Sequence, residues 1–226
     1  MAIHDWKAAM KYDAVIFDKD GVLLDSMDDD YKWADEMRKN MLGAQGKEIT
    51  IQEAEKLART SSVNKFSALL KDLGINIETL RNIEKEISKR KIEKIKAGEF
   101  RLFQDTQKVL EEITLPKSVV SNAPMETTRF VIEEYSLDNH FEAVKSPSLH
   151  DLERYVELKK PNPEMLEEVI ERMDARNPVM VGDSDEDVQA AKNAGIDSIF
   201  VNTNGGTDLD PTHKVENLES ILDIVH

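Results

Sequence analysis

The chain has 226 residues, 40% hydrophobic and 33% charged, so it can build a core large enough for one domain with an insertion. Its 45 acidic residues outnumber 30 basic ones, and the formal charge of -15 argues against nucleic-acid and anionic-lipid partners. The absence of cysteine excludes disulfides, thiolate zinc sites and a cysteine nucleophile. Since no stretch is apolar enough to form a membrane span or a signal peptide, we expect a soluble, cytoplasmic protein.

The first predicted element is a buried strand from Ala14 to Phe17, a continuous apolar run of the kind found in parallel sheets. From about Met27 to Phe100 the pattern is helical, without a convincing strand. The longest helix in this stretch carries an approximate apolar stripe, made of Leu80, Ile83, Ile87, Ile92 and Ile95. We therefore expect a helical insertion at residues 27–100.

Three further apolar runs predict buried strands in the rest of the chain. They cover Ser118 to Val120, Val179 to Val181 and Ser198 to Val201, with a weaker candidate at Phe141 to Val144. Helical patterns separate these runs, and strands that alternate with helices indicate an α/β fold with a doubly wound parallel sheet. We expect residues 1–26 and 101–226 to form this core, and residues 27–100 to form an inserted all-helical cap domain.

Helix boundaries can also be predicted. Asn162 followed by Pro163 reads as an N-cap with proline at the first helical position. Asp185 can cap the next helix, which Gly195 can end as a glycine after the last turn. Apolar positions at helical spacing predict an amphipathic C-terminal helix, and they are Leu218, Ile221, Leu222 and Val225.

Polar residues follow the predicted strands where each strand ends. Asp18 and Asp20 follow the first strand, Ser121 and Asn122 the second, and a run of acids from Asp183 to Asp187 the third. Ligands of open parallel sheets bind beyond the carboxyl ends of the strands, so these residues and Lys160 are candidates for one site. The order of nucleophile, hydroxyl, lysine and acidic pair favours phosphoryl transfer.

Phosphoryl transfer needs an in-line nucleophile and a cation that neutralises the phosphoryl oxygens. Asp18 and Asp183 can bind Mg²⁺ through carboxylates and Asp20 through its backbone carbonyl, while Asp187 can hold a metal-bound water. Lys160 can bind the phosphoryl oxygens as a point charge.

The remaining candidates handle protons and hydrogen bonds. Asp20 would carry protons, and we expect crowding by neighbouring carboxylates to favour its protonated form. Ser121 and Asn122 are candidate phosphate-binding residues, and Gly21 would permit a sharp turn between the two catalytic aspartates.

The chain resembles the haloacid dehalogenase superfamily of aspartate-nucleophile phosphatases. Four motifs occur in family order, and they are DKDGVLLDS at 18–26, SNAP at 121–124, KKPNPEM at 159–165 and VGDSDEDVQAAKNAG at 181–195. The resemblance spans nearly the whole chain and is strongest to the phosphoglycolate phosphatase and β-phosphoglucomutase branch. It implies that Asp18 is the nucleophile, Asp20 the general acid/base and Asp183 a metal ligand, and that residues 27–100 are the helical cap.

Several alternatives stay open. Asp20 argues against haloacid and phosphonate cleavage, but a phosphosugar mutase would use the same residues as a phosphatase with a small phosphorylated substrate. A phosphate-binding scaffold without activity is less favoured, because no motif residue is lost.

The polar turn from Thr60 to Lys65 is a candidate for substrate selectivity, with Lys65 binding a second anionic group or lying in solvent. Lys19 departs from the family pattern, and we expect it to point away from the catalytic aspartates. The oligomeric state is not predicted.

Overall fold

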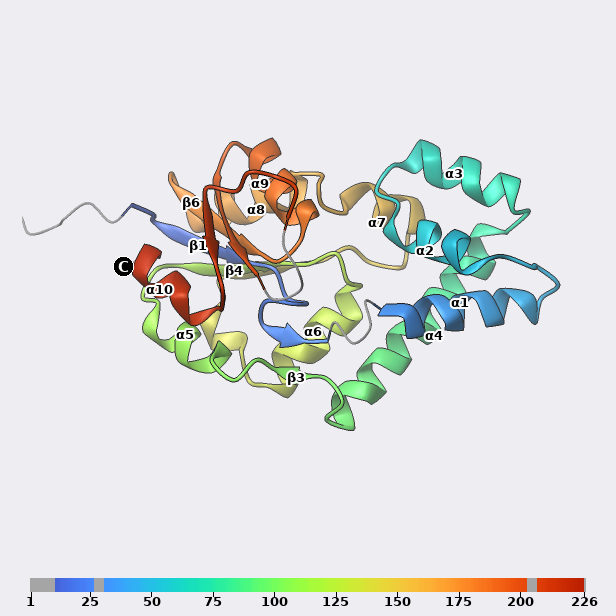
Figure 1. Cartoon of the computed structure of the whole chain (residues 1–226), viewed down its shortest axis with the longest axis horizontal. Coiled ribbons are helices and arrows are strands. Elements are labelled where there is room, and N and C mark those ends of the chain that lie inside the picture. Colours follow the sequence, from blue (N-terminus) through green and yellow to red (C-terminus); the bar gives the residue numbers. More distant parts are fainter. Residues whose placement is uncertain (1–10, 27–30, 203–206, 226) are drawn as a thin grey trace, which may run out of the picture.

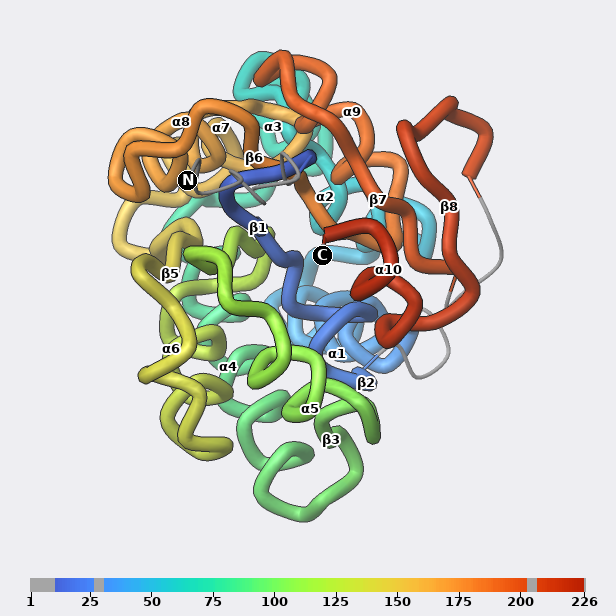
Figure 2. Tube along the Cα trace, turned by 90° about the vertical axis from the view of Figure 1, so that its left-hand side faces the viewer, coloured from blue at the N-terminus to red at the C-terminus, as the bar shows by residue number. Residues whose placement is uncertain are grey.

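The computed structural model describes residues 11–26, 31–202 and 207–225 (Figure 1). Within this part of the chain a central sheet has the order β5-β4-β1-β6-β7-β8, with every neighbouring pair parallel. The strands are β1 (Ala14–Phe17), β4 (Lys117–Val120), β5 (Ala143–Lys145), β6 (Pro178–Gly182), β7 (Asp197–Val201) and β8 (His213–Val215). The predicted parallel sheet is confirmed, and each of the five predicted strands matches within two residues. Figure 2 looks from the end of the molecule, with β5 and β8 at opposite edges of the sheet.

Helices cover both faces of the sheet, as predicted for a doubly wound fold (Figure 1). Alternate side chains of β1 point to opposite faces, so Val15 and Phe17 join one apolar cluster while Ile16 joins another. The first cluster is covered by α5 (Thr106–Glu112), α6 (Met125–Glu134) and α10 (Leu222–Val225). The second is covered by α8 (Glu164–Met173) and α9 (Asp185–Ala194). The carboxyl ends of the strands are left uncovered by these layers.

A block of four helices lies beyond those strand ends (Figure 1). Its members are α1 (Lys32–Gly43), α2 (Ile51–Arg59), α3 (Val63–Asp72) and α4 (Ile77–Lys96). They share an apolar cluster with α7 (Leu152–Leu158), which belongs to the later part of the chain. The helical character predicted for this stretch is present, and α7 extends the block's packing to a segment that the sequence analysis did not connect with it.

Two chain segments join the helical block to the sheet domain, and they lie side by side. β2 (Leu24–Asp25) precedes the block and β3 (Arg101–Leu102) follows it, and the two pair antiparallel as a short ribbon. Gly98 follows α4 with φ of 70°, a left-handed conformation that glycine adopts without steric cost. The predicted boundary at Met27 lies outside the described residues, so the division at 27 and 100 stays a prediction.

The helix ends show one correction. Ser184, and not Asp185, is the N-cap of α9, because its hydroxyl accepts the backbone N–H of Asp187 in a capping box. Gly195 ends α9 at φ of 70°, as predicted. Asn162 accepts the backbone N–H of Glu164 at 3.0 Å, as an N-cap does, although α8 itself is assigned from Glu164.

The predicted C-terminal helix is shorter than expected. It consists of a 3₁₀ turn η3 (Glu219–Ile221) followed by the single turn of α10. Its predicted apolar positions are nevertheless all buried in the core, and they are Leu218, Ile221, Leu222 and Val225. None of the helices in the described residues is long and apolar enough to span a membrane.

Candidate active site

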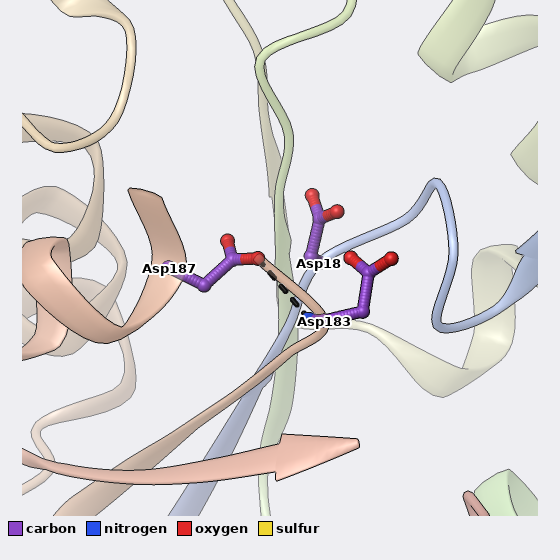
Figure 3. Close-up of side chains that lie close together, drawn as sticks. All are labelled: Asp18, Asp183 and Asp187. Atoms are coloured by element: carbon purple, nitrogen blue, oxygen red, sulfur yellow. Dashed lines mark hydrogen bonds between the residues drawn. The ribbon is translucent and has the colours of Figure 1, made fainter. Parts of the chain in front are cut away.

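Three neighbouring strands bring the candidate residues together. Because β4, β1 and β6 are adjacent and parallel, their carboxyl ends meet at one edge, and Asp18, Ser121 and Asp183 follow these ends. The carboxylates of Asp18, Asp183 and Asp187 lie within 4.8 Å of one another, and Figure 3 shows them converging from two strand ends and the first turn of α9. The structure therefore places three predicted acidic residues in one cluster.

Two glycines make the close approach of these carboxylates possible. Gly21 has φ of 83°, and a Cβ atom there would lie 1.9 Å from Asp183 Oδ2. A Cβ atom on Gly182 would lie 2.2 Å from the Cβ of Asp187. The turn predicted at Gly21 is present, and the lack of a side chain at both positions leaves the space that the acidic cluster occupies.

Lys160 is the positive centre of the cluster. The residue is 2% exposed, and its ammonium group donates to Asp18 Oδ1 at 2.7 Å, to Asp187 Oδ1 at 2.5 Å and to the carbonyl of Val120 at 3.1 Å. Burial alone would lower the pKa of Lys160, but the two carboxylates outweigh burial and raise it above its usual value. Lys160 is therefore a permanent cation beside Asp18.

Asp18 is buried beneath this arrangement. Burial raises the pKa of its carboxyl to about 6, against the opposing positive charge of Lys160, and the negative charges of Asp187 and Asp20 add to the rise. The uncharged form thus becomes accessible near neutral pH. A cation placed among the three carboxylates would favour the ionised form of Asp18.

Asp187 is held rigidly by α9 and by the loop before it. Its Oδ2 accepts the backbone N–H of Asp183 at 3.2 Å (Figure 3). The same oxygen accepts the hydroxyl of Ser184 at 2.6 Å and the backbone N–H of Ser184 at 3.2 Å. Its Oδ1 accepts Lys160. Since both oxygens already accept hydrogen bonds, Asp187 positions Lys160 and the Asp183 backbone.

Asp20 lies in a different electrostatic environment from the one predicted. Its Oδ1 accepts the hydroxyl of Ser26 at 2.6 Å and the ammonium of Lys91 at 2.8 Å, and its Oδ2 accepts Lys19 at 2.5 Å. Burial alone would raise the pKa of Asp20, but the charges of Lys19 and Lys91 outweigh it and hold the pKa well below its usual value. The prediction of a protonated Asp20 is wrong, because the positive charges of Lys19 and Lys91, which both contact its carboxylate, outweigh the burial that would raise its pKa.

The expected direction of Lys19 is also wrong. Lys19 is fully buried and its Nζ contacts Asp20, whereas alternation along a strand would have turned it away. The physical reason is that β1 ends at Phe17, so the next residues form a turn in which the Lys19 carbonyl accepts the N–H groups of Leu23 and Leu24.

Ser121 and Asn122 occupy different places at the end of β4. Ser121 is 1% exposed and lines the cavity described below, and its hydroxyl accepts the backbone N–H of Ala123 at 3.2 Å. Asn122 uses its carboxamide on the backbone of Lys160, accepting its N–H at 2.7 Å and donating to its carbonyl at 3.2 Å. The Asn122 side chain thus fixes the position of Lys160, while Ser121 lies beside the acidic cluster.

A cavity of about 430 Å³ lies between the strand ends and the helical block. The sheet domain contributes Asp18, Asp20, Ser121, Lys160 and Asp183 to its lining. The helical block adds an aromatic and aliphatic wall that includes Trp33 and Ile87, and it adds charged groups that include Arg38 and Lys91. The cavity therefore has a carboxylate-rich floor and a mixed upper wall.

Lys65 is not part of this cavity. It is exposed near the start of α3, and neither Lys65 nor any other residue of the turn from Thr60 lines the cavity. The helix places Phe66 inward and leaves the neighbouring Lys65 in solvent, so the prediction that it binds substrate is not supported.

The sequence analysis missed most of the charged residues that line the cavity away from the strand ends. Lys91 contacts Asp20 from α4, Tyr31 accepts Lys91 at 2.7 Å, and Lys159 lines the cavity beside Lys160. Lys91 could have been found, because it falls four residues from both Ile87 and Ile95 and so interrupts the apolar stripe of α4. A lysine in a buried stripe needs a partner, which here is Asp20.

The acidic cluster fits Mg²⁺, the metal that the sequence predicts. Carboxylate oxygens from Asp18 and Asp183 converge at the strand ends, and such oxygens are the ligands that Mg²⁺ prefers. Asp187 belongs to the same cluster, but its oxygens already accept hydrogen bonds from Lys160 and from the loop before α9. It therefore suits holding a metal-bound water better than binding the metal directly.

Comparison with known proteins agrees with this geometry. Residues 12–195 match the family model described as haloacid dehalogenase-like hydrolase. Pyrophosphatase PpaX of Halalkalibacterium halodurans is 30% identical over 128 residues, which are 54% of this chain and 57% of that protein. The match to this curated relative thus spans little more than half of its length.

Two solved structures share the fold over nearly their whole length. CbbY from Rhodobacter sphaeroides in complex with phosphate has a TM-score of 0.70 at 16% identity, covering 95% of this chain and 99% of that one. A predicted phosphoglycolate phosphatase from Haemophilus somnus has a TM-score of 0.69 at 15% identity, covering 96% and 100%. With a family model matching most of its length, the chain belongs to the haloacid dehalogenase-like hydrolases.

Proposed function

We propose that this protein is a Mg²⁺-dependent phosphatase that hydrolyses a small phosphomonoester through a phosphorylated Asp18. The observation that carries the proposal is the position of Asp18 at a strand end, beside the buried cation Lys160. Asp18 also lines a cavity that is large enough for a small molecule. Membership of a hydrolase family and the pyrophosphatase relative support the same class of reaction.

In the first step a carboxylate oxygen of Asp18 attacks phosphorus, the bond to the ester oxygen breaks, and the leaving oxygen takes a proton from Asp20. Lys160 and the hydroxyl of Ser121 bind phosphoryl oxygens and hold the group in line. Mg²⁺ bound by Asp18, Asp183 and the backbone carbonyl of Asp20 would supply charge neutralisation of those oxygens.

In the second step water attacks phosphorus, Asp20 takes its proton, and the bond between Asp18 and phosphorus breaks. Lys19 and Lys91 favour the carboxylate form of Asp20, which is the form that this step requires. Over one cycle the protons balance, because the proton that Asp20 takes from water in the second step replaces the one that it gives to the leaving oxygen in the first.

We also propose that residues 27–100 act as a cap over this site. The block supplies one wall of the cavity, and Lys91 reaches from α4 to Asp20, so water is kept from the phosphoryl group while the block stays in place. The paired strands β2 and β3 are the place where such a cap would swing.

The test is hydrolysis of p-nitrophenyl phosphate, pyrophosphate and a panel of sugar and acid phosphates with Mg²⁺. Asp18→Asn should leave no turnover, because an amide cannot form the acyl-phosphate, whereas the exposed substitution Asp72→Asn should leave turnover unchanged. Acid-quenched wild-type enzyme should carry a phosphoryl group on the peptide that contains Asp18. Turnover by Asp18→Asn would refute the nucleophile, and glucose 6-phosphate formed from β-glucose 1-phosphate without free phosphate would assign a mutase.

A further inference from the structure

The cations that line the cavity differ in one respect. Arg38, Arg59, Lys91 and Lys160 each have a carboxylate oxygen within 4.0 Å. Lys159 lines the same cavity and has no carboxylate at that distance among the residues that the structure describes. A buried ammonium group is normally paired, because removing its charge from water is costly.

The surroundings of Lys159 leave part of its hydrogen-bonding capacity unused. The residue is 6% exposed, and its Nζ donates to the carbonyl of Ala58 at 2.6 Å and lies 4.4 Å from the centre of the Tyr155 ring. An ammonium group has three N–H donors, so the carbonyl and the ring do not satisfy all of its capacity. Burial accordingly lowers the pKa of Lys159 to about 8.

Lys159 and Lys160 reach into the cavity from opposite sides of one backbone segment. The backbone at Lys159 is extended, with φ of -58° and ψ of 139°, which turns consecutive side chains in different directions. Lys160 reaches Asp18 on the cavity floor, whereas Lys159 reaches Ala58 at the end of α2 in the helical block. The two consecutive lysines thus supply cations to different ends of the cavity, Lys160 to the phosphoryl end and Lys159 to the end beside the helical block.

The nearest charged neighbours do not neutralise Lys159. Glu84 influences its pKa, but both carboxylate oxygens of Glu84 accept Arg38, at 2.6 and 3.1 Å. Arg38 also pairs with Asp35 at 2.5 Å. Glu186 raises the pKa of Lys159 least among the charged neighbours that act on it. The guanidinium group already has its partners, so the ammonium of Lys159 is the cation here that a new anion can pair with.

We propose that Lys159 binds a second anionic group of the substrate, a carboxylate or a phosphate on the part that leaves after phosphoryl transfer. The inference rests on the proposed phosphatase function and adds a specificity-determining residue to it. Lys159 selects phosphorylated acids and bisphosphates over phosphate esters of neutral alcohols. Only the acids and bisphosphates bring a second negative charge, which the buried ammonium group lacks as a partner.

Two substrate pairs isolate the second charge. 3-Phosphoglycerate and glycerol 3-phosphate differ by a carboxylate in place of a hydroxymethyl group, and glucose 1,6-bisphosphate and glucose 6-phosphate differ by a phosphate. Lys159→Met removes the charge at similar volume, and Lys159→Gln removes it but keeps a donor for the Ala58 carbonyl. Lys71→Met, at an exposed position on α3, is the matched control for the loss of one positive charge.

We expect wild-type kcat/KM to be at least about tenfold higher for the charged member of one or both pairs, mainly through a lower KM. Both Lys159 variants should lose that preference and keep their rate with the neutral member, and Lys71→Met should behave as wild type. The pair that shows the preference tells whether carboxylate or phosphate is bound. Equal losses with charged and neutral substrates would mean that Lys159 only holds α2 through Ala58, and would overturn the proposal.

Binding separates this inference from the proposed reaction. Isothermal titration of 3-phosphoglycerate and glucose 1,6-bisphosphate into wild type and Lys159→Gln should show weaker binding to the variant by about tenfold or more, whether or not either compound is turned over. Hydrolysis of p-nitrophenyl phosphate together with equal affinities in both proteins would refute the role of Lys159 alone. No hydrolysis of any phosphoester, with the difference in affinity preserved, would refute the phosphatase and keep the anion site.

Discussion

Replacing Lys159 by methionine should stabilise the folded protein at neutral pH. Lowering the pKa of Lys159 from 10.5 to about 8 corresponds to a cost of about 3 kcal/mol for keeping the buried side chain charged. Methionine removes that cost and fills a similar volume, but it gives up the hydrogen bond to Ala58, worth about 1 kcal/mol, and the contact of the cation with the Tyr155 ring, worth about 0.5–1 kcal/mol. The free energy of unfolding should therefore rise by about 1–2 kcal/mol at pH 7.

The gain should depend on pH in a defined direction. Below pH about 8 Lys159 is protonated in both the folded and the unfolded chain, so the full cost of the buried charge is present in the wild type. Between about 8 and 10.5 the folded protein loses the proton while the unfolded chain keeps it, so wild-type stability rises with pH relative to the variant. Above 10.5 that cost is gone.

Urea unfolding of both proteins at pH 7, 8.5 and 10 measures this difference, and the other titrating groups cancel because only the two stabilities are compared. The charged groups that act on Lys159 are Glu84, Arg38 and Glu186, and all three are unchanged in the variant. A variant that is less stable than wild type at pH 7, or an advantage that stays constant from pH 7 to 10, would refute the assignment of Lys159 as an uncompensated buried cation.

Three further predictions concern the acidic cluster. Gly182→Ala should destabilise the protein by about 1–3 kcal/mol in urea unfolding and reduce turnover, because the new Cβ would lie 2.2 Å from the Cβ of Asp187, while Gly43→Ala, which meets nothing within 4 Å, should be neutral. Lys160→Met should cost about 3–5 kcal/mol at pH 8, because it leaves the carboxylates of Asp18 and Asp187 buried without their cation, and a stability equal to wild type would contradict this pairing. Mg²⁺ at about 100 times its dissociation constant should raise the free energy of unfolding by about 3 kcal/mol and EDTA should reverse the gain and abolish hydrolysis, whereas thermal melts that do not respond to Mg²⁺ would argue against a metal site in the cluster.

The sheet could be predicted because its strands are buried on both faces. The run from Ala14 to Phe17 matches β1 at both ends, since every residue in it is buried and apolar. β6 and β7 extend beyond their predicted runs by a residue at one or both ends, because hydrogen bonding continues into Gly182 and Asp197 after the apolar pattern stops. The edge strand β8 could not be predicted, because its three residues are partly exposed and mostly polar.

The floor of the site was predictable and its upper wall was not. Residues at strand ends are fixed by the parallel topology, so Asp18, Ser121 and Asp183 could be placed in one site from their spacing alone. Side chains of the helical block reach the site by tertiary packing, and the local pattern indicates this only for Lys91, which interrupts the apolar stripe of α4. The choice of Lys65 followed its place in a polar turn, whereas the cation that reaches the catalytic aspartates comes from the buried stripe of α4.

The prediction about Asp20 failed because it counted the carboxylates of the site and left out the lysines. Asp18, Asp20, Asp183 and Asp187 suggest strong repulsion, but Lys19, Lys91 and Lys160 lie among them, so four carboxylates face three ammonium groups. With Asp18 ionised, the site keeps one net negative charge, which repels a phosphate group. The two charges of Mg²⁺ would turn this into one net positive charge, so substrate attraction would depend on the metal even though Lys160 is always charged. The site therefore needs its buried lysines to hold the aspartates in place, and it needs the metal to make the phosphoryl end of the cavity attractive to an anion.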